Sequence, residues 1–267
     1  MVTERPLKKS LGQHLLKDRN LLAKMVRLSG VGKADLVVEI GPGQGDLTRS
    51  VAPSVRGVYA VEKDERFRDA LGPLEKELPH VKVLFGDVLK ERLSDLWPGS
   101  FFTVMGNIPY NITGEILFKL LAEKAAVKAA YLTMQKEVAE RLVSRSHSRS
   151  YGALSVIFQL HASMKILLRI RPDLFIPPPK VESAFISIIF HDKEEADRGL
   201  IDFVKGCFRY KRKFLRRALE NSLEAGRIEG LYRHMDFPAS VRAEEIEPAG
   251  FFEMHRFLKE EDGVGRG

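Results

Sequence analysis

Apolar residues in this chain gather in short runs that alternate with amphipathic stretches. The runs that predict buried strands are Leu36–Ile40, Gly57–Val61, Val81–Phe85 and Phe101–Met105. The stretches between them show helical spacing at Asp46–Ala52 and Glu65–Glu77. Strand and helix signals that alternate in this way predict a mostly parallel sheet with helices on both faces, and therefore an α/β fold.

Flanking segments add further elements to this core. Helices are predicted at Asp18–Leu28, with Asp18 as the N-cap, at Gln135–Val143 and at Leu154–Ala162. Additional strands are predicted at Ala129–Thr133, Lys165–Ile170 and Phe185–Phe190.

The last part of the chain has a different character. After Asp192 the sequence holds short basic segments with helical spacing, at Gly199–Phe208, Lys211–Ala225 and Ala249–Lys259. The alternation typical of strands does not occur there. Because the charged stretch 191–195 is a suitable linker, we expect two domains: residues 1–190 with the sheet, and residues 191–267 as a small, all-helical domain.

Composition limits the partners that the protein can have. Its 267 residues carry a formal net charge of +7, which favours a polyanionic partner such as nucleic acid. Its one cysteine, Cys207, excludes an internal disulfide and a cysteine-rich zinc site. No apolar run approaches the roughly 18–20 residues of a membrane span, and no apolar signal core follows the first residues. We expect a soluble, cytoplasmic, monomeric protein that holds no metal and has no membrane partner.

A glycine-rich turn follows the first predicted strand. Gly41, Gly43 and Gly45 precede the helix predicted from Asp46, and glycines at such a junction let the backbone approach a ligand closely. Their Gly-x-Gly-x-Gly spacing differs from that of dinucleotide-binding turns, and Asp46 would repel a pyrophosphate at the start of the helix. The turn therefore favours an uncharged or cationic adenosyl ligand over a nicotinamide dinucleotide.

Acidic residues end the next two strands. Glu62 is placed to accept hydrogen bonds from both hydroxyls of a ribose, and Asp87 to accept one from an adenine amine. Either acid alone is more typical of a solvated loop. Because ligands of open α/β sheets bind at the carboxyl ends of the strands, the glycine turn, Glu62 and Asp87 together predict one nucleoside-binding site.

The fourth strand ends in Asn107-Ile108-Pro109-Tyr110. An amide oxygen and a backbone carbonyl there can accept the two hydrogens of an exocyclic amine, while the aromatic ring stacks on a base. Asn and Pro are also common in plain strand-end turns. Beside a nucleoside-binding site, the segment favours chemistry on a base amine.

With these motifs the chain resembles the KsgA-like family of ribosomal RNA small-subunit adenine-N6 dimethyltransferases. The segments that carry the resemblance are Gly12–Leu16, Glu39–Thr48, Glu62, Asp87, Asn107–Asn111, Gln135–Glu137, Arg141–Leu142, Tyr151–Val156, Phe175–Ser183 and Phe208–Leu215. The resemblance implies a Rossmann-like methyltransferase fold that uses S-adenosyl-L-methionine. It also implies dimethylation of two adjacent adenines near the 3′ end of small-subunit ribosomal RNA, in the RNA or in an immature small ribosomal subunit.

The resemblance also assigns roles to residues. The cofactor contacts that it implies are His14, Leu16, Gly41, Gly43, Glu62, Asp87 and Asn107, with His14 acting mainly through its backbone. The catalytic set that it implies is Asn107, Ile108, Pro109, Tyr110 and Phe175, with Tyr110 and Phe175 as two aromatic clamps for the base. Leu15 stands where the family usually has Phe.

Two basic runs predict a surface for RNA phosphates. The residues in them are Arg141, Arg145, Arg149, Lys205, Arg209, Lys211, Arg212, Lys213, Arg216 and Arg217. No acid occurs between Lys205 and Arg217, and Tyr210 and Phe214 interleave with the cations.

Two other readings stay open. One is a large-subunit adenine methyltransferase of the macrolide-resistance type, which shares the fold and which Ile108 slightly favours. The segments Gln135–Glu137 and Tyr151–Val156 and the three prolines Pro177 to Pro179 favour the small-subunit type. The other reading is a non-catalytic RNA-binding relative, which would not need the complete set of cofactor and amine residues.

Overall fold

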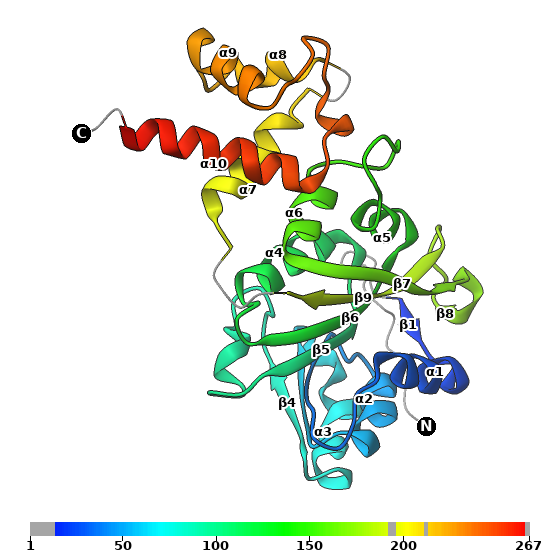
Figure 1. Ribbon diagram of the computed structural model, residues 1–267. Helices are drawn as coiled ribbons and strands as arrows, with labels where there is room; N and C mark the ends of the chain where they lie inside the picture. The colour runs from blue at the N-terminus through cyan, green and yellow to red at the C-terminus, as the bar shows by residue number, and fades with distance from the viewer. Residues whose placement is uncertain (1–13, 192–195, 211–212, 265–267) are drawn as a thin grey trace. The chain divides into compact units, whose positions relative to one another are not determined.

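The computed structural model describes residues 14–191, 196–210 and 213–264 (Figure 1). The chain forms two compact units, one of Met1–Ala139 with Ser163–Glu195 and one of Glu140–Ala162 with Ala196–Gly267. The sequence placed residues 140–162 in the first domain, whereas here they cluster with the C-terminal helices. Tyr151 provides the physical reason, because its buried hydroxyl donates to the Ile246 carbonyl at 2.8 Å and its ring packs against Phe208.

The first unit is built on a seven-stranded sheet in the order β4-β3-β2-β5-β6-β9-β7 (Figure 1). The strands are β2 Leu36–Ile40, β3 Gly57–Glu62, β4 Val81–Phe85, β5 Phe102–Asn107, β6 Val127–Gln135, β7 Ala162–Ile170 and β9 Ser183–Phe190. β4, β3, β2, β5 and β6 pair in parallel, and β9 pairs antiparallel with β6. The predicted α/β fold with a mostly parallel sheet is confirmed.

Helices and a second, small sheet accompany the main sheet. The helices are α1 Arg19–Ser29, α2 Asp46–Val51, α3 Arg68–Glu77, α4 Thr113–Ala122 and α5 Lys136–Leu142. The N-cap prediction for Asp18 is confirmed, because its Oδ1 accepts from the Leu21 N–H at 2.9 Å. β1 Leu15–Leu16 pairs with β8 Phe175–Ile176 in a separate two-stranded sheet. This pairing attaches the segment around His14 to a part of the chain far away in the sequence.

The sequence analysis did not predict α4. Its buried positions Ile116, Leu117, Leu120 and Leu121 have the helical spacing that would have revealed it. A 3₁₀ turn over Tyr110–Ile112 joins the Asn107–Tyr110 segment to α4.

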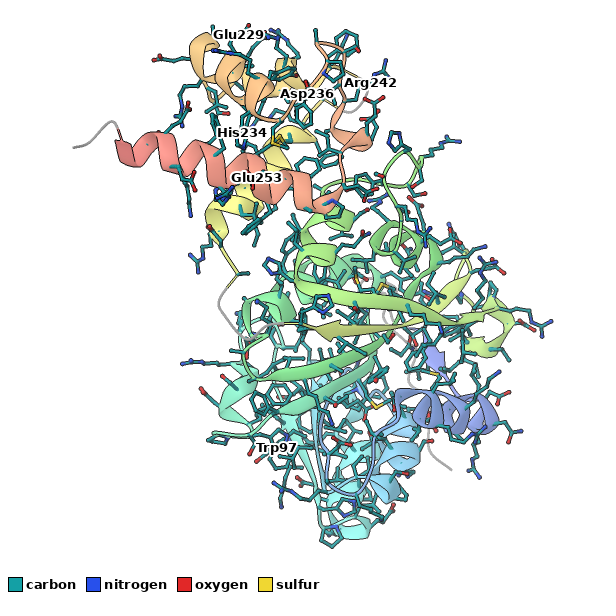
Figure 2. The ribbon with its side chains drawn as sticks, in the orientation of Figure 1. Trp97, Glu229, His234, Asp236, Arg242 and Glu253 are labelled. Carbon is teal, nitrogen blue, oxygen red and sulfur yellow. The ribbon has the colours of Figure 1, made fainter. Side chains whose placement is uncertain are left out.

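The second unit is helical. Its helices are α6 Ala153–His161, α7 Arg198–Cys207, α8 Leu215–Leu219, α9 Ala225–His234 and α10 Pro248–Val264. The continuous helix predicted over Lys211–Ala225 is wrong, because α8 ends at Leu219 and α9 begins at Ala225. Asn221 explains the break: its side-chain amide donates to the Arg217 and Ala218 carbonyls, which competes with continuation of the helix. His234 and Glu253, labelled in Figure 2, tie α9 to α10 at 2.8 Å.

Candidate functional site

The carboxyl ends of β2, β3 and β5 surround one pocket, called the central pocket here. Its lining residues come from the glycine turn after β2, from the ends of β3 and β5 and the turns that follow them, and from His14 and Leu15. They are His14, Leu15, Gly41, Gly43, Glu62, Phe67, Asn107, Ile108, Pro109 and Tyr110. An adjoining outer pocket shares Gly41, Glu62 and Pro109 with it and adds Asp87 and Val88. The structure therefore brings together most of the predicted cofactor and catalytic residues, without Leu16 and Phe175.

The glycine turn has a backbone that other residues rarely adopt. Gly41 and Gly43 have φ angles of 67° and 58°, in the left-handed region. A Cβ built on Gly43 would lie 2.6 Å from Cδ2 of Leu15, inside the lining of the central pocket. A side chain at Gly43 would therefore collide with Leu15, so the close approach of this backbone to the pocket lining requires glycine.

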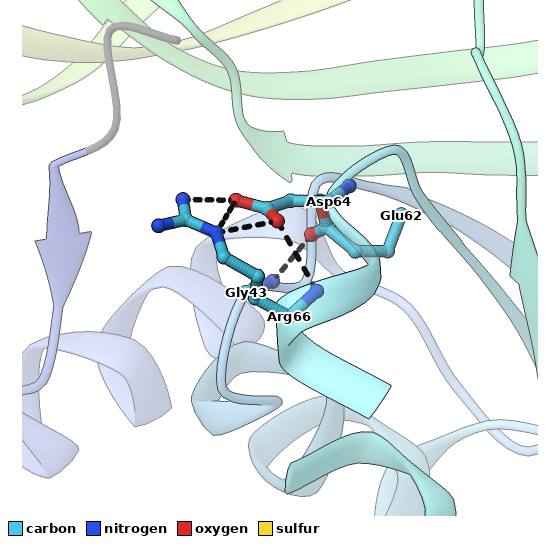
Figure 3. A network of polar contacts seen from close by, with 4 residues as sticks. All are labelled: Gly43, Glu62, Asp64 and Arg66. Carbon is cyan, nitrogen blue, oxygen red and sulfur yellow. Dashed lines mark hydrogen bonds and ion pairs between the residues drawn. The ribbon is translucent and has the colours of Figure 1, made fainter. Parts of the chain in front are cut away.

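Glu62 links this turn to the end of β3 (Figure 3). Its Oε2 accepts from the Gly43 N–H at 2.9 Å and its Oε1 from the Asp64 N–H at 2.8 Å. Asp64 in turn forms an ion pair of 2.5 Å with Arg66. Burial raises the pKa of Glu62 above its ordinary value. Each carboxylate oxygen retains acceptor capacity beyond its backbone donor, as binding of ribose hydroxyls requires.

Asp87 reaches the outer pocket from the end of β4. Its Oδ2 accepts from the Lys63 ammonium at 2.7 Å and its Oδ1 from the Leu89 N–H at 3.1 Å. The bond from Lys63 holds the pKa of Asp87 below its usual range, so the group is an ionised acceptor at neutral pH. Lys63 was not among the site residues predicted from the sequence, although its position between Glu62 and Asp64 at a strand end was a usable signal.

The Asn107–Tyr110 segment begins at the last residue of β5, as predicted. Asn107 Nδ2 donates to the His14 carbonyl at 2.5 Å, and the Ile108 N–H donates to the Thr133 carbonyl at 3.1 Å. The Tyr110 hydroxyl lies 2.5 Å from Ser183 Oγ, and burial raises the pKa of this phenol. The segment is therefore held at three points along its length.

Phe175 lies in the hydrophobic core and not among the residues that line the central pocket. Only 1% of its surface is exposed, and it packs in the main hydrophobic core with Phe185 and Met105. The structure does not bring its ring to the pocket that Tyr110 lines. Its role as an aromatic clamp stays a prediction, while its burial is the core packing that a phenylalanine without the family motif would be expected to have.

Leu16 and Glu39 are buried next to the glycine turn. Leu16 is buried in the core and lines a third pocket with Gly41, Asn107 and Glu39. Among the described residues, none forms a hydrogen bond with Oε2 of Glu39. Burial is the main cause that raises the pKa of Glu39 to about 8. Glu39 was part of a quoted motif, but the sequence analysis gave it no role.

This buried carboxyl makes the stability of the protein depend on pH. In the folded chain Glu39 keeps its proton up to a pKa of about 8, whereas in the unfolded chain it loses it near 4.5. The folded state therefore binds more protons between these values, and the free energy of unfolding falls as pH rises through this window. We expect Glu39→Gln to gain stability over the wild type from pH 5 to pH 9, measured as the difference in Tm. A difference that stays constant with pH would contradict the assignment.

Both basic runs lie in the second unit. Arg141, Arg145, Arg149, Lys205, Arg209, Lys213 and Arg217 are exposed there, and Arg216 is half-buried. Lys211 and Arg212 lie outside the described residues. Arg216 pairs with Glu229 at 2.8 Å, Arg217 with Glu220 at 3.1 Å and Lys205 with Asp202 at 3.9 Å.

These ion pairs change which cations are available to a phosphate. Within the parts of the chain that the structure describes, no acidic side chain pairs with Arg145, Arg209 or Lys213. These three are the strongest candidates for phosphate contact. The sequence analysis treated all the cations alike because the partner acids stand outside the basic run.

None of the described helices is both long and apolar enough to cross a bilayer. Across residues 14–191, 196–210 and 213–264, no group of three or more His, Cys, Asp and Glu side chains is arranged to hold a metal ion.

Comparison with known proteins gives a consistent result. The model of the family described as ribosomal RNA adenine dimethylase matches residues 5–260. A protein of Francisella tularensis subsp. tularensis (strain WY96-3418), named ribosomal RNA small subunit methyltransferase A, is 37% identical over 256 residues, which cover 94% of this chain and 97% of the relative.

Solved structures share the fold. A dimethyladenosine transferase from Plasmodium falciparum has a TM-score of 0.81 at 24% identity and covers 93% of this chain and 98% of its own. The 23S rRNA methyltransferase ErmE has a TM-score of 0.70 at 24% identity, and the match covers 92% of this chain and 99% of ErmE. From the family match and the full-length relative, we conclude that this chain belongs to the ribosomal RNA adenine dimethylase family.

Proposed function

We propose that this protein uses S-adenosyl-L-methionine to dimethylate the exocyclic amines of two adjacent adenines near the 3′ end of small-subunit ribosomal RNA. Family membership and the name of the 37% identical relative support the reaction and the target. The observation that carries the proposal is the convergence of Glu62, Asn107 and Tyr110 on one pocket at the carboxyl ends of the strands.

The residues around the two pockets fit an adenosyl cofactor. Glu62 would bind the ribose and Asp87 the adenine amine, while the backbone at Gly41 and Gly43 gives the space for close approach. His14, Leu16 and Asn107 would contact the rest of the molecule. When bound, the cofactor supplies a methyl group on a sulfonium, which is already a good leaving group.

The chain's own residues would prepare the nucleophile. An adenine amine is a weak nucleophile because its lone pair is delocalised into the ring. The Asn107 side-chain oxygen and the Ile108 carbonyl would accept its two hydrogens, which favours a more tetrahedral nitrogen, and Tyr110 would stack on the base. Positioning and electrostatics of this kind lower a barrier without a general base.

The second unit would hold the RNA. A target adenine must leave its stack to enter the pocket, and phosphate contacts would keep the flanking RNA in place while it does so. Recognition through shape and phosphates suits a structured ribosomal RNA hairpin or an immature small subunit. We propose that the protein acts on it in the cytoplasm as a monomer.

Methyl transfer to ribosomal subunits tests the proposal. Purified protein and tritiated S-adenosylmethionine are incubated with unmethylated small and large subunits, and the modified nucleotides are mapped. We expect dimethyladenosine at two neighbouring positions of the small subunit. Label only in the large subunit would instead establish the macrolide-resistance type of activity, and absence of label despite cofactor binding would indicate a binding role.

The RNA surface has its own prediction. Replacing Arg145, Arg209 and Lys213 together by alanine should weaken binding of the small subunit. It should also make the slope of log K against log salt shallower by roughly 0.7–0.9 per lost phosphate contact. A control that replaces the paired residues Lys205 and Arg217 should change the slope less. An equal slope in wild type and triple variant would show that these cations only face solvent.

A further inference from the structure

His14 makes three contacts, two of them with the side chains that would hold the target amine, and its cofactor role does not explain them. The His14 carbonyl accepts from Asn107 Nδ2 at 2.5 Å. The His14 ring stacks on Tyr110, with ring centroids 5.3 Å apart and planes 29° from parallel. Nδ1 of the same ring lies 2.7 Å from the Pro177 carbonyl. One residue therefore joins the two side chains that would hold the target adenine.

The contact with Asn107 determines which end of its amide is available. A side-chain amide has a donor end and an acceptor end, and only the oxygen can accept a hydrogen from the target amine. A carbonyl only accepts, so the His14 carbonyl binds the NH2 end of Asn107. The oxygen end is then left for the substrate. A flipped amide would place two oxygens against each other and present a donor to the donating amine.

The ring contacts fix the position of that carbonyl. Because the Pro177 oxygen can only accept, Nδ1 of His14 must carry the hydrogen, which defines the tautomer. The other contact is with Tyr110, whose hydroxyl is in turn held by Ser183 on β9. Pairing of β1 with β8 places Leu15 opposite Ile176, next to Pro177. The ring is thus anchored on two elements that are separate from the His14 backbone.

We propose that His14 is a positioning residue for methyl transfer: its carbonyl orients the Asn107 amide with the oxygen toward the target amine, and its ring keeps that carbonyl in place. This inference rests on the proposed function, because it assigns Asn107 the role of amine acceptor. It goes beyond cofactor contact, since it predicts an effect on the chemical step.

The test compares His14→Ala with His14→Phe and the control His191→Ala. His191 follows the opposite end of β9 from Ser183, is exposed, and lies 3.4 Å from Ser163 Oγ through its Nε2. Each variant is assayed for the dissociation constant of S-adenosylhomocysteine, for KM of the unmethylated small subunit, and for kcat at saturation. We expect kcat of the alanine variant to fall about 10-fold, the effect of about 1.4 kcal/mol. Its KM and its dissociation constant for S-adenosylhomocysteine should stay within about 3-fold of the wild-type values. The Phe variant keeps a ring that can stack on Tyr110, so its kcat should lie between those of the wild type and the alanine variant.

Several outcomes would overturn the proposal. An alanine variant with unchanged kcat would do so, as would one whose only defect is weaker cofactor binding. A faster variant with lower KM for the subunit would show instead that the ring competes with the incoming base. A Phe variant as slow as the alanine variant would show that stacking of a ring on Tyr110 does not hold the His14 carbonyl in place.

A second readout does not depend on catalysis. In protein labelled with 15N at asparagine, the side-chain NH2 resonances of Asn107, assigned through Asn107→Ala, report directly on the bond to His14. They should shift in His14→Ala and stay unchanged in His191→Ala. If the wild type methylates no adenine, the proposed function fails while this bond is still measured. If the resonances do not move, the positioning role fails whatever the activity.

Discussion

Replacing Asn107 by alanine is expected to reduce methyl transfer by roughly 100- to 1,000-fold, the effect of removing one preorganised polar group from a reacting centre. The side chain lies at the end of β5 with its NH2 group engaged by His14, so its oxygen is the group left to accept a hydrogen of the target amine. Alanine removes that acceptor. Because Asn107 also lines the central pocket, where we propose that the cofactor binds, binding of S-adenosylhomocysteine should weaken but remain measurable.

The measurement is single-turnover methylation of small subunits with enzyme in excess, together with calorimetry of product-cofactor binding. Asn20→Ala is a matched control, because Asn20 is an exposed residue of α1 outside the pocket linings described above. Unchanged turnover in Asn107→Ala would remove the side chain from the mechanism. A loss of cofactor binding as large as the loss of rate would reduce its role to holding the cofactor.

Replacing Glu62 by glutamine is expected to weaken cofactor binding by about 10- to 100-fold, which corresponds to the roughly 1.5–3 kcal/mol of a hydrogen bond to a charged group. In the wild type, both carboxylate oxygens accept backbone N–H groups, from Gly43 and Asp64. An amide has one oxygen, so its NH2 end would face one of these donors. The variant therefore loses charge toward the ribose and also leaves a buried N–H unpaired.

Two measurements separate these effects. Calorimetric titration with S-adenosylmethionine gives the affinity, and thermal unfolding without cofactor gives the cost of the unpaired N–H, about 1–3 kcal/mol. Glu65→Gln is the control, because Glu65 is exposed and pairs with Arg68 at 3.2 Å on the protein surface. Unchanged affinity in Glu62→Gln would show that the ribose is bound elsewhere.

Much of the site was predictable because short-range patterns determine it. The apolar runs located the strands, and the residues that end parallel strands meet at one edge of the sheet, so Glu62, Asp87 and Asn107 were found without a structure. The glycine spacing added the turn between them. Each of these inferences needed only residues that are close together in the sequence.

The remaining features depend on contacts between distant residues. His14 meets Asn107 across 93 positions and Pro177 across 163, which no local pattern encodes. Phe175 resembles a clamp in its motif, but β1–β8 pairing and core packing bury it. Arg216 is part of a run without acids, yet the fold brings Glu229 to it from α9. Burial and pairing of charge are tertiary properties and could not be predicted from spacing.

The second unit is assembled from two separate stretches of sequence, and this restricts how such proteins can exchange parts. Tyr151, from the inserted stretch, binds the Ile246 carbonyl and packs on Phe208, so neither stretch has a complete core alone. A chimaera that takes only the C-terminal helices from a relative would pair Tyr151 and its neighbours with a foreign surface. Recombination between family members at a single crossover near residue 195 should therefore yield poorly folded proteins, whereas transfer of both stretches together should succeed.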